Sequence, residues 1–338
     1  MGQALSGTQF YVFGRKYFTR TGYEKNVKAY KQPVQSSAVI GINGEGADGV
    51  DLSGKVIVVT GANSGVGKEI ATYAAAKGAN LYMLCRSQGR AETARKEIED
   101  ITKNENIKVL LADVGELSQV RKVVEELQSK ESHVDCLVCN AGVLLNERKE
   151  TSEGNEVTFA SHFLGGSYLL SKLLIPQLKA SPDGRVVFVS SGGMLTTKFP
   201  TDLDVATSSG TQKEKYNGQL AYAYAKRGQV LLAERFTKDY PEIKFCSAHP
   251  GWSLTNAVEA AYGDSKKYLE PMRSPWQGAE GISWLMGTKN IESGEFYLDR
   301  RVFTKHVAGL FMSEGKFTKN TESDIDNMMS KLKDLTGL

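Results

Sequence analysis

The sequence has few of the residues that build disulfide scaffolds or metal centres. Its 338 residues include only four cysteines and four histidines. The cysteines, at positions 85, 136, 139 and 246, are widely spaced and three of them lie in apolar runs, which is typical of buried free thiols in a reducing compartment. Cys136 and Cys139 have C-x-x-C spacing, but no second pair completes a zinc site. We therefore expect a buried strand there and no bound metal.

Long apolar runs and a strong net charge are also missing. No stretch of about 18 apolar residues occurs, which excludes a transmembrane helix of ordinary length. The N-terminus lacks the apolar core of a secretory signal. The formal net charge is only +3, too small to indicate a nucleic-acid partner. These absences favour a cytoplasmic globular protein that binds no nucleic acid.

The N-terminal segment departs from this ordinary composition. Residues 1–6 read Met-Gly-Gln-Ala-Leu-Ser, which fits the M-G-x-x-x-[ST] pattern for N-myristoylation of Gly2. Six basic residues follow against one acidic residue, Glu24, and five aromatic residues are interleaved with them: Phe10, Tyr11, Phe13, Tyr17 and Phe18. An acyl chain with a basic amphipathic segment supplies the two signals that peripheral membrane attachment requires. Packing of the aromatic segment on the main domain is the alternative, and both stay open.

Apolar strands alternate with helical patterns along most of the chain. Strands are expected at 55–60, 81–85, 108–111, 134–138, 185–189, 244–247 and 294–298. Helices are expected at 66–77, 90–102, 118–130, 155–180, 219–239 and 322–335. Strands that are apolar throughout and separated by helices indicate a parallel sheet covered on both faces. The sequence therefore predicts an α/β protein with a doubly wound, Rossmann-type parallel sheet of about seven strands.

Composition divides the chain into three parts. Residues 41–49 are rich in glycine and resemble a flexible linker. We expect an N-terminal helical extension with this linker over 1–50, one Rossmann-fold domain over 51–310, and a C-terminal tail with a terminal helix over 311–338.

A glycine-rich turn joins the first expected strand to the first helix. It reads Thr-Gly-Ala-Asn-Ser-Gly-Val-Gly over residues 60–67. Its glycines allow a tight turn and a close approach of the backbone to a pyrophosphate, while the start of the next helix stabilises the negative charge. This context, after a strand and before a helix, is the one that gives the motif weight. The sequence thus predicts a dinucleotide site contacted by Gly61, Asn63, Ser64, Gly65, Val66 and Gly67.

The end of the second expected strand indicates which dinucleotide is bound. An NAD-selective site places an acidic residue there to bind the ribose hydroxyls. This chain reads Cys85-Arg86-Ser87 instead. The Arg86 guanidinium suits a 2′-phosphate, and Ser87 adds a hydroxyl donor, so NADP(H) is favoured over NAD(H). The alternative is that Arg86 only stacks on the adenine.

A tyrosine and a lysine have the spacing of a proton-transfer pair. Tyr222 and Lys226 are four residues apart, which places them on one face of the expected helix 219–239. A phenol with a pKa near 10 is a poor acid–base group at neutral pH, and a neighbouring ammonium is expected to lower that pKa. Tyr222 then exchanges a proton with a substrate oxygen.

These motifs together resemble the short-chain dehydrogenase/reductase family, over residues 52 to 300. Its T-G-x-x-x-G-x-G, N-A-G, Y-x-x-x-K and P-G-x-x-x-T motifs all occur here in order. The resemblance implies an NAD(P)-dependent oxidoreductase whose cofactor is also contacted by Asp113, Val114, Asn140, Ala141, Gly142, Tyr222, Lys226, Pro250, Gly251 and Thr255. It further implies a serine at the end of the fifth strand whose hydroxyl binds the substrate oxygen. Ser191 is the candidate for this role and Ser190 the alternative.

One position departs from the family pattern. The family has an asparagine in the helix before the fifth strand, and this chain has His162 there, followed by one extra residue within Gly165-Gly166-Ser167. Three interpretations stay open: His162 relays protons in place of the asparagine, it marks altered or lost activity, or it is a buried histidine with satisfied hydrogen bonds.

Finer features resemble the branch of dehydrogenase/reductase family member 12, including Thr21-Gly-Tyr-Glu24 and His249-Pro-Gly-Trp252. The segment 252–275, a mobile lid in the family, holds several apolar residues and suits a hydrophobic carbonyl or alcohol as substrate. A catalytically weak subunit that binds nucleotide within a larger assembly is the alternative function. The oligomeric state stays open between a monomer, a homodimer and such an assembly.

Overall fold

The computed structural model describes residues 2–30, 49–201, 203, 216–255, 258–259, 262–307 and 314–338. In this part of the chain one sheet has the strand order β3-β2-β1-β4-β5-β6-β7-β8. Seven strands are mutually parallel: β1 (Val56–Thr60), β2 (Asn80–Cys85), β3 (Ile107–Leu111), β4 (Cys136–Cys139), β5 (Arg185–Val189), β6 (Lys244–Ala248) and β7 (Phe296–Leu298). The short β8 (Arg301–Val302) is antiparallel to β7 and was not predicted, because two residues carry no periodicity.

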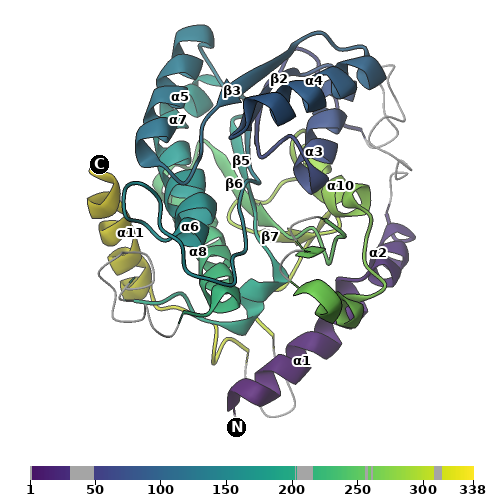
Figure 1. The fold of residues 1–338 in the computed structure, drawn as a ribbon, viewed down its shortest axis with the longest axis vertical. Helices are drawn as coiled ribbons and strands as arrows, with labels where there is room; N and C mark the ends of the chain where they lie inside the picture. Colours follow the sequence, from purple (N-terminus) through teal and green to yellow (C-terminus); the bar gives the residue numbers. More distant parts are fainter. Residues whose placement is uncertain are drawn as a thin grey trace.

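Helices cover both faces of the sheet, as predicted (Figure 1). One face packs against α3 (Gly65–Ala76), α4 (Gln88–Thr102) and α10 (Pro275–Leu285). The other packs against α5 (Leu117–Lys130), α7 (Leu170–Ala180) and α8 (Gly218–Asp239). All five residues of β1 and of β5 are buried, which agrees with strands covered on both sides. The doubly wound fold is confirmed.

The helix expected over 155–180 changes type along its length. A short α6 (Val157–Phe159) leads into a π-helix, η1 (Ala160–Leu169), before α7 begins. A π-turn accommodates one additional residue within a helix, so it absorbs the extra residue found in the sequence at 165–167. Only glycine fits at positions 165 and 166 of this turn. A Cβ on Gly165 would lie 2.1 Å from the Val114 carbonyl oxygen, and a Cβ on Gly166 would lie 1.9 Å from the Ser161 carbonyl oxygen.

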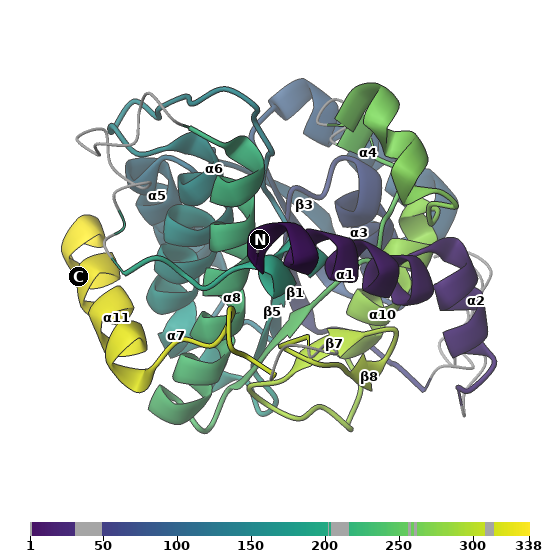
Figure 2. The same cartoon turned by 90° about the horizontal axis from the view of Figure 1, so that it is seen from below.

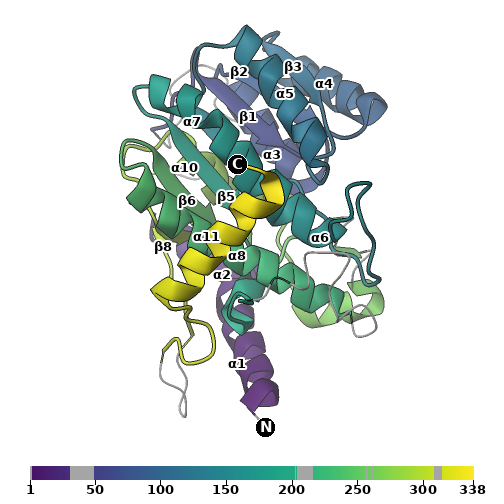
Figure 3. The same ribbon diagram turned by 90° about the vertical axis from the view of Figure 1, so that its left-hand side faces the viewer.

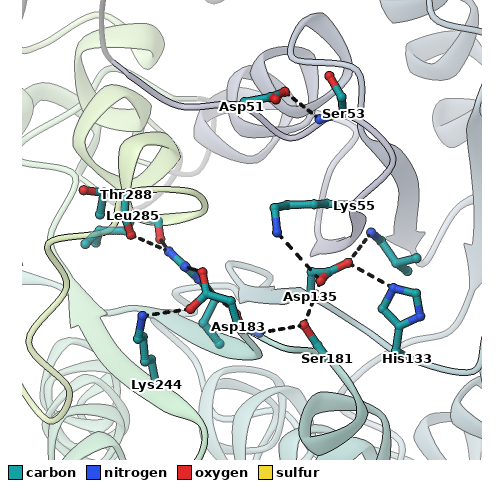
Figure 4. A network of polar contacts seen from close by, with 12 residues as sticks. Asp51, Ser53, Lys55, His133, Asp135, Ser181, Asp183, Lys244, Leu285 and Thr288 are labelled. Atoms are coloured by element: carbon teal, nitrogen blue, oxygen red, sulfur yellow. Dashed lines mark hydrogen bonds and ion pairs between the residues drawn. The ribbon is translucent and has the colours of Figure 1, made fainter.

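The amino ends of the central strands are joined by a charge network (Figure 4). Asp135, just before β4, accepts hydrogen bonds from the Val56 backbone N–H at 2.8 Å and from the Ser181 hydroxyl at 2.7 Å. Arg185, which begins β5, is fully buried, donates to two backbone carbonyls and pairs with Asp183. Asp183 also binds Lys244 at the start of β6, at 2.8 Å. This network links the amino ends of β1, β4, β5 and β6, at the end of the sheet opposite the cavity.

Three helices lie outside the alternating series. The N-terminal α1 (Gly2–Tyr17) and α2 (Arg20–Val27) pack beside the carboxyl ends of the strands, and the N-terminus projects from the molecule (Figures 1 and 3). The C-terminal α11 (Glu322–Thr336) packs on η1 and α8, with Ile325, Met328 and Leu332 in the core. No described helix is long and apolar enough to cross a membrane. The expected linker 41–49 lies outside the described residues up to position 48.

Candidate active site

A large cavity opens at the carboxyl ends of the parallel strands. Its volume is about 1250 Å³, larger than the roughly 300–1,000 Å³ of a pocket for one small molecule. Every residue predicted from the sequence to bind cofactor or to act in catalysis lines it. The motifs that are spread from residue 60 to 255 therefore meet in one place, at the position where strand order reverses between β1 and β4.

The glycine turn has the shape that phosphate binding needs. Gly61 and Gly65 adopt positive φ angles of 66° and 53°, which disfavour any side chain. A Cβ on Gly67 would lie 2.3 Å from the Gly61 carbonyl oxygen. Ser64, which precedes α3, makes no side-chain capping bond to the first turn. The amides at the start of α3 therefore fit the pyrophosphate of a dinucleotide.

The N-A-G motif ties the ends of two strands together. The hydroxyl oxygen of Thr60, the last residue of β1, accepts hydrogen bonds from the backbone N–H groups of Asn140 and Ala141 at 2.9 and 2.8 Å. The Asn140 amide donates in turn to the Thr60 carbonyl at 2.9 Å. Gly142 leaves room for a histidine, because a Cβ there would lie 1.8 Å from the His162 ring. This motif shapes the floor of the cavity.

The end of β2 carries the basic residues expected near a 2′-phosphate. Arg86 is mostly exposed and forms an ion pair of 3.4 Å with Asp113 at the end of β3. Such an exposed pair adds little stability and leaves the guanidinium accessible. Arg90, in the first turn of α4, lines the same part of the cavity. Arg90 was not predicted from the sequence. Its position four residues after Arg86 could have indicated a second basic residue near the 2′-phosphate.

Lys226 is a buried cation held by two acceptors. Its ammonium donates to the Val189 carbonyl at 2.6 Å and to the Gln229 side-chain oxygen at 3.2 Å. It lies 5.4 Å from the centre of the Tyr222 ring. Burial lowers the pKa of Lys226 to about 7. The amine therefore exchanges protons near neutral pH.

The pKa of Tyr222 differs from the sequence-based expectation. Burial raises it to about 12, and a hydrogen bond with Ser191 opposes this rise only in part. The expected lowering by the Lys226 ammonium does not appear among the contributions to this pKa: besides burial, Tyr262 raises it, and Ser191 alone lowers it. Tyr222 is thus a neutral phenol with a proton to donate at pH 7.

The two serines at the end of β5 have different surroundings. Ser190 is buried and its hydroxyl donates to the Lys226 carbonyl at 2.8 Å. Ser191 is partly exposed to the cavity, and its oxygen accepts only a long bond of 3.4 Å from the Gly193 N–H beside its contact with Tyr222. Of the two, Ser191 has the hydroxyl that remains available for a ligand.

His162 lies against the tyrosine in a neutral state. Its ring is 5.1 Å from that of Tyr222, at 83° to it. Nε2 lies 2.9 Å from the Val143 carbonyl, and buried Nδ1 has no hydrogen-bond partner among the described residues. Burial holds its pKa well below the usual value. Within the described part of the chain, only one of the two ring nitrogens of His162 is hydrogen-bonded, so Nδ1 remains free to accept a hydrogen bond from a ligand.

Gln229 links this histidine to the lysine and was not predicted. It is fully buried and its amide donates to the His162 carbonyl at 3.0 Å and to the Ser167 hydroxyl oxygen at 2.9 Å. Its oxygen accepts from Lys226. A glutamine three residues after the lysine carries no recognisable signal in one sequence.

Part of the cavity, which we call its apolar end, is lined by apolar side chains. Its lining includes Leu144, Trp252, Leu254, Leu269 and Met272. Two residues of α1, Phe10 and Tyr11, also line it, so the N-terminal segment belongs to the site. The four cysteines are buried and free, and burial raises the pKa values of the Cys136 and Cys139 thiols to about 12, as expected of core residues.

Comparison with known proteins identifies the family of the chain. The family model for short chain dehydrogenase matches residues 55–199. Dehydrogenase/reductase SDR family member 12 from Homo sapiens is 35% identical over 303 residues, covering 88% of this chain and 89% of that protein. Retinol dehydrogenase 11 from Homo sapiens is 34% identical over 263 residues, covering 75% and 80%. The predicted resemblance to the member 12 branch is confirmed.

Solved structures show the same fold at lower identity. A protein from Mycobacterium paratuberculosis aligns with a TM-score of 0.65 at 23% identity, over 85% of this chain and 95% of that one. A short chain dehydrogenase from Escherichia coli, complexed with NADPH, aligns with a TM-score of 0.58 at 20% identity, over 73% and 97%. These structures show the fold, and the relatives at 34–35% identity show the family: the chain belongs to the short-chain dehydrogenase/reductase family and is an NAD(P)-dependent oxidoreductase that acts on a small molecule.

Proposed function

We propose that this protein interconverts a hydrophobic carbonyl compound and its alcohol with NADP(H), and that Tyr222 transfers the proton. The observation that carries the proposal is the convergence of Ser191, Tyr222 and Lys226 in one cavity with the glycine turn. Tyr222 is a phenol that carries its proton at neutral pH, which suits the donation of a proton to a carbonyl oxygen in the reductive direction of this interconversion.

Each residue has a distinct role in this proposal. The nicotinamide supplies or accepts the hydride when the cofactor is bound. Ser191 donates a hydrogen bond to the substrate oxygen, and Tyr222 protonates that oxygen as charge develops on it. Lys226 stabilises the resulting phenolate and presents its remaining N–H to the cofactor ribose. His162 orients the Tyr222 ring from the side and offers Nδ1 as a hydrogen-bond acceptor.

The cofactor preference rests on Arg86, with Arg90 and Ser87 beside it. These side chains present two guanidinium groups and a hydroxyl at the end of β2 where an NAD-selective site has an acid. The Escherichia coli structure in complex with NADPH is consistent with this choice. We expect Arg86→Leu to weaken NADPH binding about tenfold or more and to leave NADH binding nearly unchanged. Equal losses for both cofactors would contradict the assignment.

The substrate class rests on the apolar end of the cavity. Trp252, Leu254 and Met272 line it. The name of one relative, retinol dehydrogenase 11, indicates that this relative acts on a hydrophobic alcohol. We infer a hydrophobic aldehyde, ketone or alcohol for this chain.

Peripheral membrane contact through a myristoylated Gly2 is a further part of the proposal. Arg15, Lys16 and Arg20 on α1 and α2 are exposed and available to an anionic surface. Intact-mass measurement of protein made in a myristoylating cell tests it, and a retained Met1 or an unmodified Gly2 would exclude the acyl anchor.

The catalytic role is tested by NADPH oxidation with a panel of aldehydes and ketones. Turnover by the wild-type protein, and its loss by a factor of 10² or more in Tyr222→Phe, is expected for a general acid. Tyr224→Phe is the matched control, since it makes the same change two residues along α8 and outside the cavity. Tight NADPH binding without turnover of any carbonyl would instead favour a nucleotide-binding subunit.

A further inference from the structure

The N-terminal helix α1 contributes two aromatic side chains to the lining of the cavity. Phe10 and Tyr11 of α1 line the cavity together with Trp252. The Tyr11 ring stacks on the Trp252 indole, with ring centres 6.2 Å apart and 26° between the planes. Gly14 lets the helix approach this closely, because a Cβ there would lie 2.4 Å from the indole. Seen from below, α1 crosses the middle of the molecule (Figure 2).

Packed rings connect this helix to the residue proposed to bind the substrate oxygen. Phe18, which follows α1, is fully buried and contacts Trp252 with ring centres 5.9 Å apart. A Cβ on Gly192, the residue after Ser191, would lie 2.6 Å from the Phe18 ring. The wall from Ser191 to Tyr11 is therefore continuous, and α1 faces the same space as the reacting group.

A buried ion pair locks α1 in this position. Arg273 is almost fully buried and binds Asp299 through both oxygens. The same guanidinium donates to the carbonyls of Tyr17 and Phe18 at 2.9 Å, at the end of α1. It therefore joins the segment after Trp252, the turn after β7 and the end of α1.

The turn that supplies Asp299 is itself strained. Asp299 and Arg300, which connect β7 to β8, both adopt positive φ angles, 54° and 58°, although neither is glycine. Each such residue costs about 1 kcal/mol or more and persists only where its surroundings require it. Here both side chains are in buried ion pairs, Asp299 with Arg273 and Arg300 with Glu280. A two-residue hairpin turn between β7 and β8 itself favours positive φ at both positions. The Asp299 carboxylate also accepts a hydrogen bond of 2.8 Å from the Asn26 amide of α2, so this turn is linked to both N-terminal helices, to α1 through Arg273.

We infer that α1 is a wall of the substrate site and that Tyr11 and Trp252 determine specificity. The inference rests on the proposed carbonyl reduction and adds which residues select the substrate and what shape of substrate they select. The substrate is a carbonyl compound whose apolar chain extends away from the reacting carbon and lies against these two rings. Short carbonyl compounds reach Ser191 and Tyr222 but leave the aromatic pair uncovered.

Two aldehydes of different length test the inference in the full-length protein. We expect decanal to have a much higher kcat/KM than propanal with NADPH. Tyr11→Ala and Trp252→Ala should lower kcat/KM for decanal about tenfold or more, mainly through KM, because they remove apolar contact that is made before and during reaction. Activity with propanal and affinity for NADPH should change less than twofold. Val12→Ala is the matched control on α1, since Val12 is 64% exposed.

A fluorescence binding assay tests the role of Tyr11 and Trp252 without requiring turnover. N-phenyl-1-naphthylamine, a neutral apolar fluorophore, should bind the NADPH-saturated wild-type protein and the Tyr222→Phe variant equally. It should bind Tyr11→Ala and Trp252→Ala about tenfold more weakly. Leucine at either position provides a second variant if alanine prevents folding, and it should give the same order of affinities.

The two proposals fail in different ways. Absence of NADPH oxidation with both aldehydes would refute the proposed reaction, and the fluorophore would still report on the wall. An unchanged decanal-to-propanal ratio in the Tyr11 and Trp252 variants would overturn the inference while leaving the reaction intact. Absence of fluorophore binding to the wild-type protein, or equal binding by all variants, would also overturn it.

Discussion

Replacing Lys226 by methionine should stabilise the cofactor-free protein at pH 6. The ammonium is 2% exposed, and burial lowers its pKa from 10.5 to about 7. A pKa difference of this size corresponds to about 5 kcal/mol at about 1.36 kcal/mol per unit. Lys226→Met removes this cost but also loses two hydrogen bonds, each contributing about 1 kcal/mol. The expected net gain at pH 6 is therefore about 3 kcal/mol.

The gain should depend on pH with a definite sign. Below pH 7 both the folded and the unfolded states carry a protonated Lys226, and the full cost of burying the charge applies. Between pH 7 and 10.5 the unfolded state binds more protons, so the stability of the wild-type protein rises with pH. By pH 9 the wild-type protein should have recovered about 2–3 kcal/mol, so the advantage of Lys226→Met should nearly vanish.

Urea unfolding at pH 6, 7, 8 and 9 and constant ionic strength measures this difference. Comparing the two proteins at each pH cancels the titration of groups that do not interact with Lys226. Of the groups that do, burial lowers the pKa values of His162 and His249 well below their usual value and raises that of Cys139 to about 12, so they titrate little between pH 6 and 9. The matched control is Lys122→Met, the same change at an exposed position on α5, where no pH-dependent difference is expected. A difference between wild type and Lys226→Met that is constant from pH 6 to 9, or a less stable variant at pH 6, would refute the reasoning.

Two further predictions concern the cofactor turn and the opposite edge of the sheet. Gly67→Ala should weaken NADPH binding at least tenfold in a fluorescence titration, because its Cβ would lie 2.3 Å from the Gly61 carbonyl oxygen. Asp135→Asn should lower the free energy of unfolding by about 1–3 kcal/mol in urea, since it weakens a charged acceptor for the Val56 N–H; unchanged stability would contradict the structural role.

Features governed by local backbone requirements were predictable from the sequence. The glycine turn at 60–67, the pair Tyr222 and Lys226, and the alternation of strands and helices all follow from spacing and residue type, and the structure brings the motif residues together. Helix bounds agree within a few residues, for example 218–239 against the expected 219–239. Parallel strands bring their carboxyl ends to one edge, so motifs at strand ends meet there in any such fold.

Features that depend on long-range packing were not predictable. The bond from Arg273 to Phe18 joins residues 255 apart in sequence, and no local pattern announces such a pair. The direction of the Tyr222 pKa shift depends on how deeply the phenol is buried, which spacing on a helix does not reveal. The extra residue near Gly166 was visible, but its accommodation in a π-helix required the packing against Val114 and Ser161.

The N-terminal helix reconciles two interpretations that the sequence left as alternatives. Its aromatic residues pack inward, with Phe13, Tyr17 and Phe18 around Phe303 and Trp252, while Arg15 and Lys16 stay exposed. The membrane contact that we propose would therefore use a face of the helix other than the packed one, and the two interpretations do not exclude each other. An acylated Gly2 at the projecting end of α1 would tether the helix that forms the wall of the substrate site (Figure 3). A membrane-derived apolar substrate would then meet the cavity beside the anchor, whereas a chain without α1 would keep the phosphate turn but lose the aromatic wall.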